Sequence, residues 1–194
     1  MVVSLVGVSG STRRPSRTSE VVRALLDAVA EHLDLEPHII ELADAAPLVL
    51  PTLTRADADA ETEAVIRSIE TADILVVGTP VYRASYTGAL KHLFDLVHHD
   101  ALAGKPVVLA ATGGSAMHCP VIEHQLRPLF GFFRALTLPT AVYATEADFT
   151  DGVLTGAATL DRVDRAAREV AELVAGRPRT CPAPSARRRV PAGV

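Results

Sequence analysis

The order in which apolar segments recur along the chain restricts the fold more than any other feature of the sequence. Short apolar runs predict β-strands at residues 2–9, 37–41, 72–79, 105–111 and 136–143. Apolar residues at helical spacing predict helices at residues 18–33, 61–71, 87–97, 120–134 and 160–174. Because strands and helices alternate, we expect a parallel sheet of five strands with a layer of helices on each face.

This arrangement of elements is typical of a flavodoxin-like α/β fold, a three-layer sandwich around a five-stranded parallel sheet. At 194 residues the chain is long enough for one domain with a substantial core. We place this domain at residues 1–175. Residues 176–194 are rich in proline and arginine, and we interpret them as a disordered C-terminal tail.

Proline residues predict two irregular segments within the domain. Pro47 and Pro51 interrupt the segment 42–60, which we interpret as a long loop. Pro128 lies inside a helical pattern and removes a backbone hydrogen bond toward His124. We therefore expect a kink or bulge near His124, and such irregularities often mark functional or interface positions.

Charge and hydropathy exclude several classes of partner. The formal net charge is −4, and the last nineteen residues contain five arginines and no acidic residue, so the domain itself is more acidic than the whole chain. A nucleic-acid partner is therefore not expected, since phosphate contacts require a basic face. No apolar run approaches the ~20 residues of a membrane helix. The sequence begins with a strand pattern and not with a signal segment, so we expect no membrane association and a cytoplasmic location.

The cysteines and histidines predict neither a redox pair nor a metal centre. Cys119 and Cys181 are far apart in the sequence, and we interpret both as incidental thiols. The histidines that lie near one another lack metal-ligand spacing with carboxylates: His98, His99, His118 and His124. We expect surface or capping roles for these histidines.

Three loops directly follow predicted strands, at residues 10–18, 80–86 and 112–115. In an open parallel sheet such loops share one edge and line one crevice. The first loop runs into a helix, whose free amides and dipole favour an anion. Its hydroxyl and guanidinium donors predict a phosphate site at Ser11, Arg13, Ser16, Arg17 and Thr18. Neither GxxxxGK[ST] nor GxGxxG is present, so the phosphate of a mononucleotide is favoured over a P-loop or dinucleotide site.

The second and third loops have residues that suit a flat ring system. Tyr82 offers an aromatic ring where a planar ligand would lie, and Arg83 offers positive charge near a flavin that becomes anionic on reduction. Gly113 and Gly114 allow close approach of the backbone and leave two amides free for carbonyl oxygens. Together the three loops predict a site for flavin mononucleotide (FMN).

The loops resemble those of NAD(P)H-dependent FMN reductases, particularly the reductases of two-component alkanesulfonate and methanesulfonate monooxygenases. The resemblance covers residues 1–175 and rests on GSTRRPSRTS, TPVYRASYTGALKHLFDL, LAATGGS and HQLRP. It implies that the FMN phosphate binds to Ser11, Arg13, Ser16, Arg17 and Thr18. It implies that the ribityl chain and ring contact Pro80, Val81, Tyr82, Arg83 and Ser85. It implies that the pyrimidine edge binds to Thr112, Gly113, Gly114 and Ser115.

The resemblance also implies an activity and an assembly. We expect hydride transfer from C4 of a reduced nicotinamide to N5 of FMN, with no side chain required as general acid or base and none assigned as catalytic. Reduced FMN would then leave for a partner monooxygenase. Members of the family are typically tetramers built as paired dimers, so we expect a homodimer or homotetramer. Some members have a π-type bulge at the position matched by His124.

Other functions remain open at this point. A quinone, azo or chromate reductase would keep FMN bound and reduce another acceptor, whereas a flavodoxin-like electron carrier would bind FMN without nicotinamide activity. A ligand-free interaction domain is the third alternative. The sequence does not distinguish NADH from NADPH, because its loop arginines cannot be divided between two phosphates: Arg13, Arg14, Arg17 and Arg83.

Overall fold

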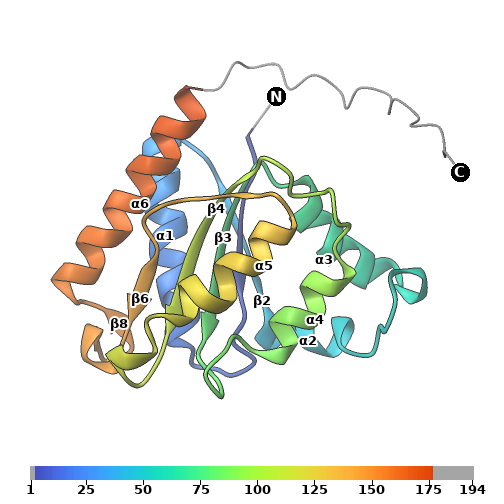
Figure 1. Cartoon of the computed structure of the whole chain (residues 1–194), viewed down its shortest axis with the longest axis horizontal. Helices are drawn as coiled ribbons and strands as arrows, with labels where there is room; N and C mark the ends of the chain where they lie inside the picture. The colour runs from blue at the N-terminus through green and yellow to red at the C-terminus, as the bar shows by residue number, and fades with distance from the viewer. Residues whose placement is uncertain (1–2, 177–194) are drawn as a thin grey trace, which may run out of the picture.

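The computed structural model describes residues 3–176. These residues form three layers, with a parallel sheet between two layers of helices (Figure 1). In spatial order the strands are β2 (Pro37–Glu41), β1 (Leu5–Ser9), β3 (Ile74–Pro80), β4 (Pro106–Thr112) and β5 (Leu136–Thr137), with β6 (Val142–Ala144) also paired to β4. Every pairing in this sheet is parallel. The predicted flavodoxin-like architecture is therefore confirmed.

Two groups of helices bury the two faces of the sheet. One face is covered by α1 (Arg17–Leu33) and α6 (Ala157–Ala175), which contact each other through a shared apolar cluster. The other face is covered by α2 (Leu42–Val49), α3 (Ala60–Thr71), α4 (Gly88–Leu96) and α5 (Arg127–Phe132). Shorter turns are the 3₁₀ segments η1 (Arg55–Asp57), η2 (Ala116–His118) and η4 (Glu146–Asp148), and the π-helix η3 (Ile122–Leu126).

Helix α1 packs against two strand residues that lack a side chain, Gly7 and Gly78. A β-carbon on Gly7 would lie 2.6 Å from Cδ1 of Leu26, and one on Gly78 would lie 2.5 Å from Cγ2 of Val22. Such distances are too short for real contacts, so a larger residue would push the helix outward. The two glycines thereby allow α1 to lie directly against β1 and β3.

The predicted long loop over residues 42–60 is wrong. Residues 42–49 form α2 although Pro47 lies inside it, and Arg55–Asp57 form a 3₁₀ turn. Helix α2 buries Leu42 and Val49 completely against the core. This burial offsets the hydrogen bond that Pro47 cannot donate, so tertiary packing overrides local propensity here.

The predicted strand at residues 136–143 is interrupted. Its first part, β5, pairs Val107 with Thr137, and its second part, β6, pairs Ala110 with Val142. Between these pairs the edge strand has two more residues than β4 has, so the residues around Pro139 leave the ladder. Proline has no N–H to donate, which is compatible with a break at the edge of a sheet.

The irregularity predicted near His124 is confirmed as a π-helix at Ile122–Leu126. The backbone N–H of Arg127 donates to the carbonyl of Ile122, five residues earlier, before α5 continues in ordinary α-helical form. Pro128 lies in the first turn of α5 and lacks the N–H that an uninterrupted α-helix would direct at His124.

Two predictions concern the C-terminal segment of the chain. Apart from Gly176, the predicted tail lies outside the described residues, and so does Cys181. Among the helices of residues 3–176, none combines the length and the apolar composition that a bilayer span requires.

Candidate functional site

A cavity of about 790 Å³ lies at the carboxyl ends of β1, β3, β4 and β6. The loops that surround it lie at the bottom of the sheet in Figure 1. Residues from all three predicted loops line this one cavity; of the predicted site residues, only three do not: Arg83, Ser85 and Ser115. Its volume is within the usual range for small-molecule sites, about 300–1,000 Å³.

The first wall of the cavity is the N-terminus of α1. Ser16 is the N-cap, and its side chain accepts a hydrogen bond of 3.1 Å from the backbone N–H of Ser19. Within residues 3–176, the backbone amides of Arg17 and Thr18 have no hydrogen-bond partner. Both residues line the cavity, so two free N–H groups and the positive end of the helix dipole are available to an anion there.

The three arginines of the first loop have different surroundings. The Arg13 guanidinium lies 5.9 Å from the ring centroid of Tyr82, so it connects the first and second loops. Arg17 forms an ion pair with Glu146 and lies 5.8 Å from the ring centroid of Phe149. Arg14 is directed away from the cavity, toward β2 and α2, where it binds Glu41 at 2.9 Å and also pairs with Asp44. Of the three, Arg13 and Arg17 line the cavity, and Arg17 already has a carboxylate partner there.

The second loop forms a tight turn that places Tyr82 on the cavity and turns Arg83 away. Reciprocal backbone hydrogen bonds of 2.9 and 3.2 Å join Tyr82 and Ser85. The two residues between them, Arg83 and Ala84, have φ angles of 52° and 64°, which non-glycine residues rarely adopt. Arg83 is exposed, and Ser85 donates a long hydrogen bond of 3.4 Å to Gln125 of the π-helix. Neither Arg83 nor Ser85 lines the cavity, contrary to expectation.

The third loop is connected to the other walls through hydrogen bonds. The hydroxyls of Thr18 and Thr112 lie 2.7 Å apart and are buried, which ties the start of α1 to the end of β4. The amide of Gly113 donates to the carbonyl of Ala144 at 3.0 Å. The expectation of two free glycine amides is therefore wrong for Gly113, because that amide pairs with β6. Gly114 faces open space, with no atom within 4 Å of where its β-carbon would be.

Tyr143 explains why Gly113 has no side chain. A β-carbon at Gly113 would overlap the hydroxyl oxygen of Tyr143. That hydroxyl donates to the carbonyl of Ser115 at 2.7 Å, and burial raises the pKa of Tyr143, with a smaller contribution from Cys119. Ser115 itself caps the 3₁₀ turn η2 by accepting from the N–H of Met117. Ser115 therefore supports the loop without lining the cavity.

The sequence prediction missed the opposite wall of the cavity, which consists of residues 144–153. It contains η4 and an antiparallel hairpin of β7 (Phe149–Thr150) and β8 (Val153–Leu154). The hairpin turn, Asp151-Gly152, has φ angles of 50° and 84°. An Asp-Gly pair between short apolar segments is a recognised hairpin signal, and it was available in the sequence.

Asp148 holds this wall together. Its carboxylate accepts hydrogen bonds from the backbone N–H and the hydroxyl of Thr145, at 2.7 and 2.9 Å, and from the hydroxyl of Thr159 at 2.7 Å. Burial alone would raise the pKa of Asp148, but these hydrogen bonds outweigh it and hold the pKa below its ordinary value. The carboxylate thereby joins η4 to the first turn of α6.

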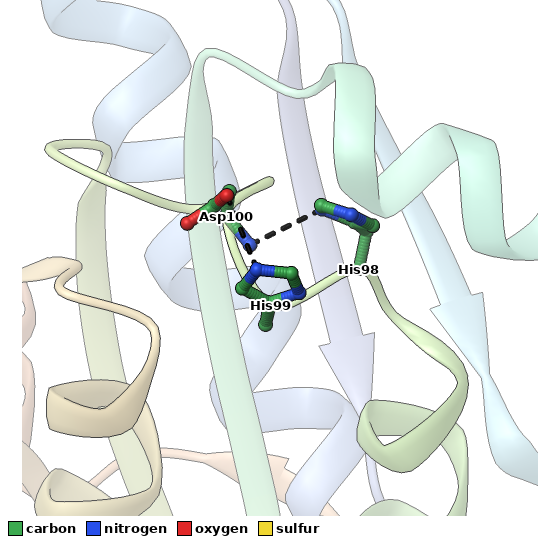
Figure 2. Close-up of side chains that lie close together, drawn as sticks. All are labelled: His98, His99 and Asp100. Atoms are coloured by element: carbon green, nitrogen blue, oxygen red, sulfur yellow. Dashed lines mark hydrogen bonds and ion pairs between the residues drawn. The ribbon is translucent and has the colours of Figure 1, made fainter. Parts of the chain in front are cut away.

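A group of possible metal ligands lies elsewhere, in the segment that precedes β4. The ligand atoms of His98, His99 and Asp100 lie within 4.8 Å of one another (Figure 2). His98 Nδ1 accepts a hydrogen bond of 3.3 Å from the N–H of Asp100, and His99 Nε2 lies 3.2 Å from the Asp100 carboxylate. Arg134 also pairs with that carboxylate and would repel a cation. These residues are at the amino-terminal edge of the sheet and contribute nothing to the cavity lining.

Comparison with known proteins identifies relatives over most of the chain. A family model described as NADPH-dependent FMN reductase matches residues 3–150. A Pseudomonas fluorescens protein named NADH-dependent FMN reductase SfnF is 52% identical over 171 residues, which are 88% of this chain and 91% of that protein. A Pseudomonas aeruginosa protein named FMN reductase (NADPH) is 49% identical over 173 residues, 89% of this chain and 93% of that protein.

A solved structure agrees with this result. An oxidoreductase from Corynebacterium diphtheriae superposes with a TM-score of 0.81 at 34% identity, and the alignment covers 91% of this chain and 99% of that one. The family match covers the three loops and most of the opposite wall, which are the parts of the chain that form the cavity. The chain is therefore an oxidoreductase and belongs to the NADPH-dependent FMN reductase family.

Proposed function

We propose that this protein reduces FMN with NAD(P)H and binds FMN in the cavity between α1 and residues 144–153. The observation that supports this most strongly is that one cavity combines an anion site with Tyr82 and the open backbone at Gly114. The free amides of Arg17 and Thr18, with two guanidinium groups, suit a phosphate. Tyr82 and the open backbone at Gly114 suit a flat ring with polar edges.

The predicted residues have separate roles in this proposal. Ser11, Arg13, Ser16, Arg17 and Thr18 bind the phosphate, and Pro80, Val81 and Tyr82 contact the ribityl chain and ring. The pyrimidine edge lies against Thr112, Gly113 and Gly114. Ser115 acts without contacting FMN, as a cap that holds the third loop in place. Arg83 and Ser85 act through the turn that positions Tyr82.

Bound FMN supplies a ring that accepts hydride from the reduced nicotinamide. The contribution of the protein is orientation and electrostatics. The amide of Gly114 lines the cavity and is available to donate to negative charge that develops on the ring. Tyr143 holds the glycine loop in place through its hydrogen bond to Ser115. No proton transfer by a side chain is required.

The experiment that tests this function measures oxidation of NADH and NADPH with and without added FMN. We expect oxidation of at least one nicotinamide to depend on added FMN. Absence of FMN-dependent oxidation with both nicotinamides would contradict the proposal. FMN that binds without any nicotinamide oxidation would favour an electron carrier. FMN that remains bound through gel filtration would favour a reductase of quinone, azo or chromate acceptors.

We also propose that the reduced FMN passes to a partner monooxygenase of the alkanesulfonate or methanesulfonate type, in the cytoplasm. Relatives named NADH-dependent FMN reductase SfnF and SfnE support the release of reduced FMN as a product. The resemblance of the loops to reductases of two-component monooxygenases supports the choice of partner. The exposed position of Tyr82 and of both cavity arginines supports a flavin that exchanges with solvent. A coupled assay in which this protein and NAD(P)H replace chemically reduced FMN for such a monooxygenase tests the transfer.

A homodimer or homotetramer is the third part of the proposal. A groove of about 1,020 Å³ runs along the π-helix and α5. Apolar residues such as Tyr86, Leu129, Phe132 and Phe133 line it together with charged and polar residues. Phe132 is 68% exposed, which is unusual for a large apolar side chain. Light scattering after gel filtration tests the assembly. We expect a dimer or larger, and we expect Phe132→Ser to shift it toward the monomer.

A further inference from the structure

The contact between Arg17 and Glu146 spans the two walls of the cavity. Arg17 is the first residue of α1, beside the free amides, and Glu146 is the first residue of η4 on the opposite wall. Their side chains form an ion pair although they are 129 residues apart in the sequence. The carboxylate therefore occupies one of the guanidinium groups that face the proposed phosphate position.

We infer that Glu146 weakens the binding of the FMN phosphate by competing with it for Arg17, and thereby keeps FMN an exchangeable substrate. This inference rests on the proposed function, since it concerns the same cavity. A phosphate that approaches the α1 N-terminus must displace Glu146 from Arg17. The displaced carboxylate then remains close to a dianion, which lowers the affinity for FMN.

The backbone around Glu146 keeps its carboxylate near the cavity. Thr145 and Asp148 form a capping box that fixes η4, in which the Thr145 hydroxyl and the Asp148 carboxylate each bind the backbone of the other. Glu146 can change its side-chain rotamer, but its backbone cannot leave the wall without breaking these hydrogen bonds. Its negative charge therefore persists beside the phosphate position.

A role for Glu146 in presenting Arg17 to the phosphate is less consistent with the structure. The Arg17 guanidinium also packs over Phe149, so its position does not depend on Glu146 alone. The ion pair is exposed, with side chains 48% and 73% accessible, and such pairs contribute little to order. Removing Glu146 therefore has little effect on the order of Arg17, and it removes a larger repulsion between the carboxylate and the phosphate.

The other charged residues of the cavity do not duplicate this arrangement. Glu20 pairs with Arg23 at 2.8 Å, and Arg23 does not line the cavity. Neither Asp151 nor Arg13 forms an ion pair with any residue of the described range 3–176. Among the described acidic residues that line the cavity, Glu146 is thus the one bound to a cavity arginine.

The test compares two ligands that differ only in the phosphate. FMN and riboflavin are titrated against the wild-type chain and Glu146→Gln at low ionic strength, with flavin fluorescence as the readout. We expect the Kd for FMN to fall about tenfold in the variant and the Kd for riboflavin to stay unchanged, because riboflavin has no phosphate. The effect on FMN should shrink as salt is added.

Asp44→Asn is the matched control. Asp44 pairs with Arg14 of the same loop, and the two side chains are 70% and 52% exposed, yet neither residue lines the cavity. The substitution removes the same charge from the same kind of pair, so we expect no change in the Kd for FMN. A fall equal to that of Glu146→Gln would assign the effect to net charge and overturn the inference.

A double-mutant cycle with Arg17→Gln tests the competition itself. In that background Glu146 has no arginine to occupy and only its direct repulsion of the phosphate remains, so we expect the benefit of Glu146→Gln to become smaller. An unchanged or weaker affinity for FMN in the single variant, or an equal gain for riboflavin, would overturn the inference while leaving the proposed function intact. A wild-type chain that binds neither flavin would overturn both.

Discussion

The two walls of the cavity are held in place in different ways. The α1 wall continues directly into the core, since Thr18 and Ser19 are buried and Val21 and Val22 pack against the sheet. The opposite wall, residues 144–153, consists of a 3₁₀ turn and a hairpin of two-residue strands, with much of its surface exposed. In the proposed function, the α1 wall is the more rigid, cationic side that binds the phosphate, and residues 144–153 are a less stable, acidic side that lowers the affinity.

Substitution of Arg13 should give the largest effect on binding, because Arg13 lines the cavity and, within residues 3–176, no carboxylate pairs with it. We expect Arg13→Gln to raise the Kd for FMN about tenfold to a hundredfold, as for loss of a hydrogen bond to a charged group. Riboflavin affinity should change much less. Equal losses for both flavins, measured by fluorescence titration, would place Arg13 at the ring and not at the phosphate.

Gly113→Ala should disturb the point where the third loop meets β6. The added methyl group would overlap the Tyr143 hydroxyl, so we expect a loss of about 1–3 kcal/mol in the free energy of unfolding. In a Tyr143→Phe background the nearest remaining ring atom is 3.2 Å away, and the loss should shrink. Urea denaturation of the four proteins measures this coupling, and additive effects would argue against the overlap.

Asp148→Asn should loosen the acidic wall and change its response to pH. The pKa of Asp148 is lowered in the folded state, so its stabilising contribution is complete above the ordinary aspartate pKa and disappears as the pH falls through the lower folded value. We expect the variant to lose about 1–2 kcal/mol at pH 7 and to show a flatter decline in acid. Thermal melting from pH 7 to pH 2 measures both effects, and parallel curves would contradict this role for Asp148.

Gly152→Ala should have the smallest effect. The φ angle of 84° at Gly152 is costly for alanine, by roughly 1 kcal/mol, but the strain lies in a short exposed hairpin. We expect faster hydrogen exchange at residues 149–154 and little change in global stability. Asp151→Asn, which tolerates the left-handed conformation, is the control with unchanged exchange. Global destabilisation by Gly152→Ala would show that the two walls unfold as one unit.

The sequence was most informative where the determinants lie close together in the chain. The hydroxyls, arginines and helix start of the first loop fall within residues 10–18, and the structure places that helix start within one residue of the prediction. The π-helix was predictable for the same reason, since Pro128 acts on a carbonyl four residues earlier.

The prediction failed where distant residues decide the conformation. The ion pair of Glu146 with Arg17 and the hydrogen bond of Gly113 with Ala144 both require the folded sheet edge. The outward direction of Arg83 depends on two left-handed residues that composition gives no reason to expect. The helix α2 forms despite Pro47 because burial of its apolar residues in the core stabilises it. A local sequence pattern does not show this burial.

The most direct test of the two-wall account is an experimental structure of the protein with FMN bound. We expect the phosphate within hydrogen-bond distance of the Arg17 and Thr18 amides, the ring against Tyr82 and Gly114, and Glu146 displaced from Arg17. A phosphate bound away from the α1 N-terminus, or a ring outside the cavity between α1 and residues 144–153, would contradict the account.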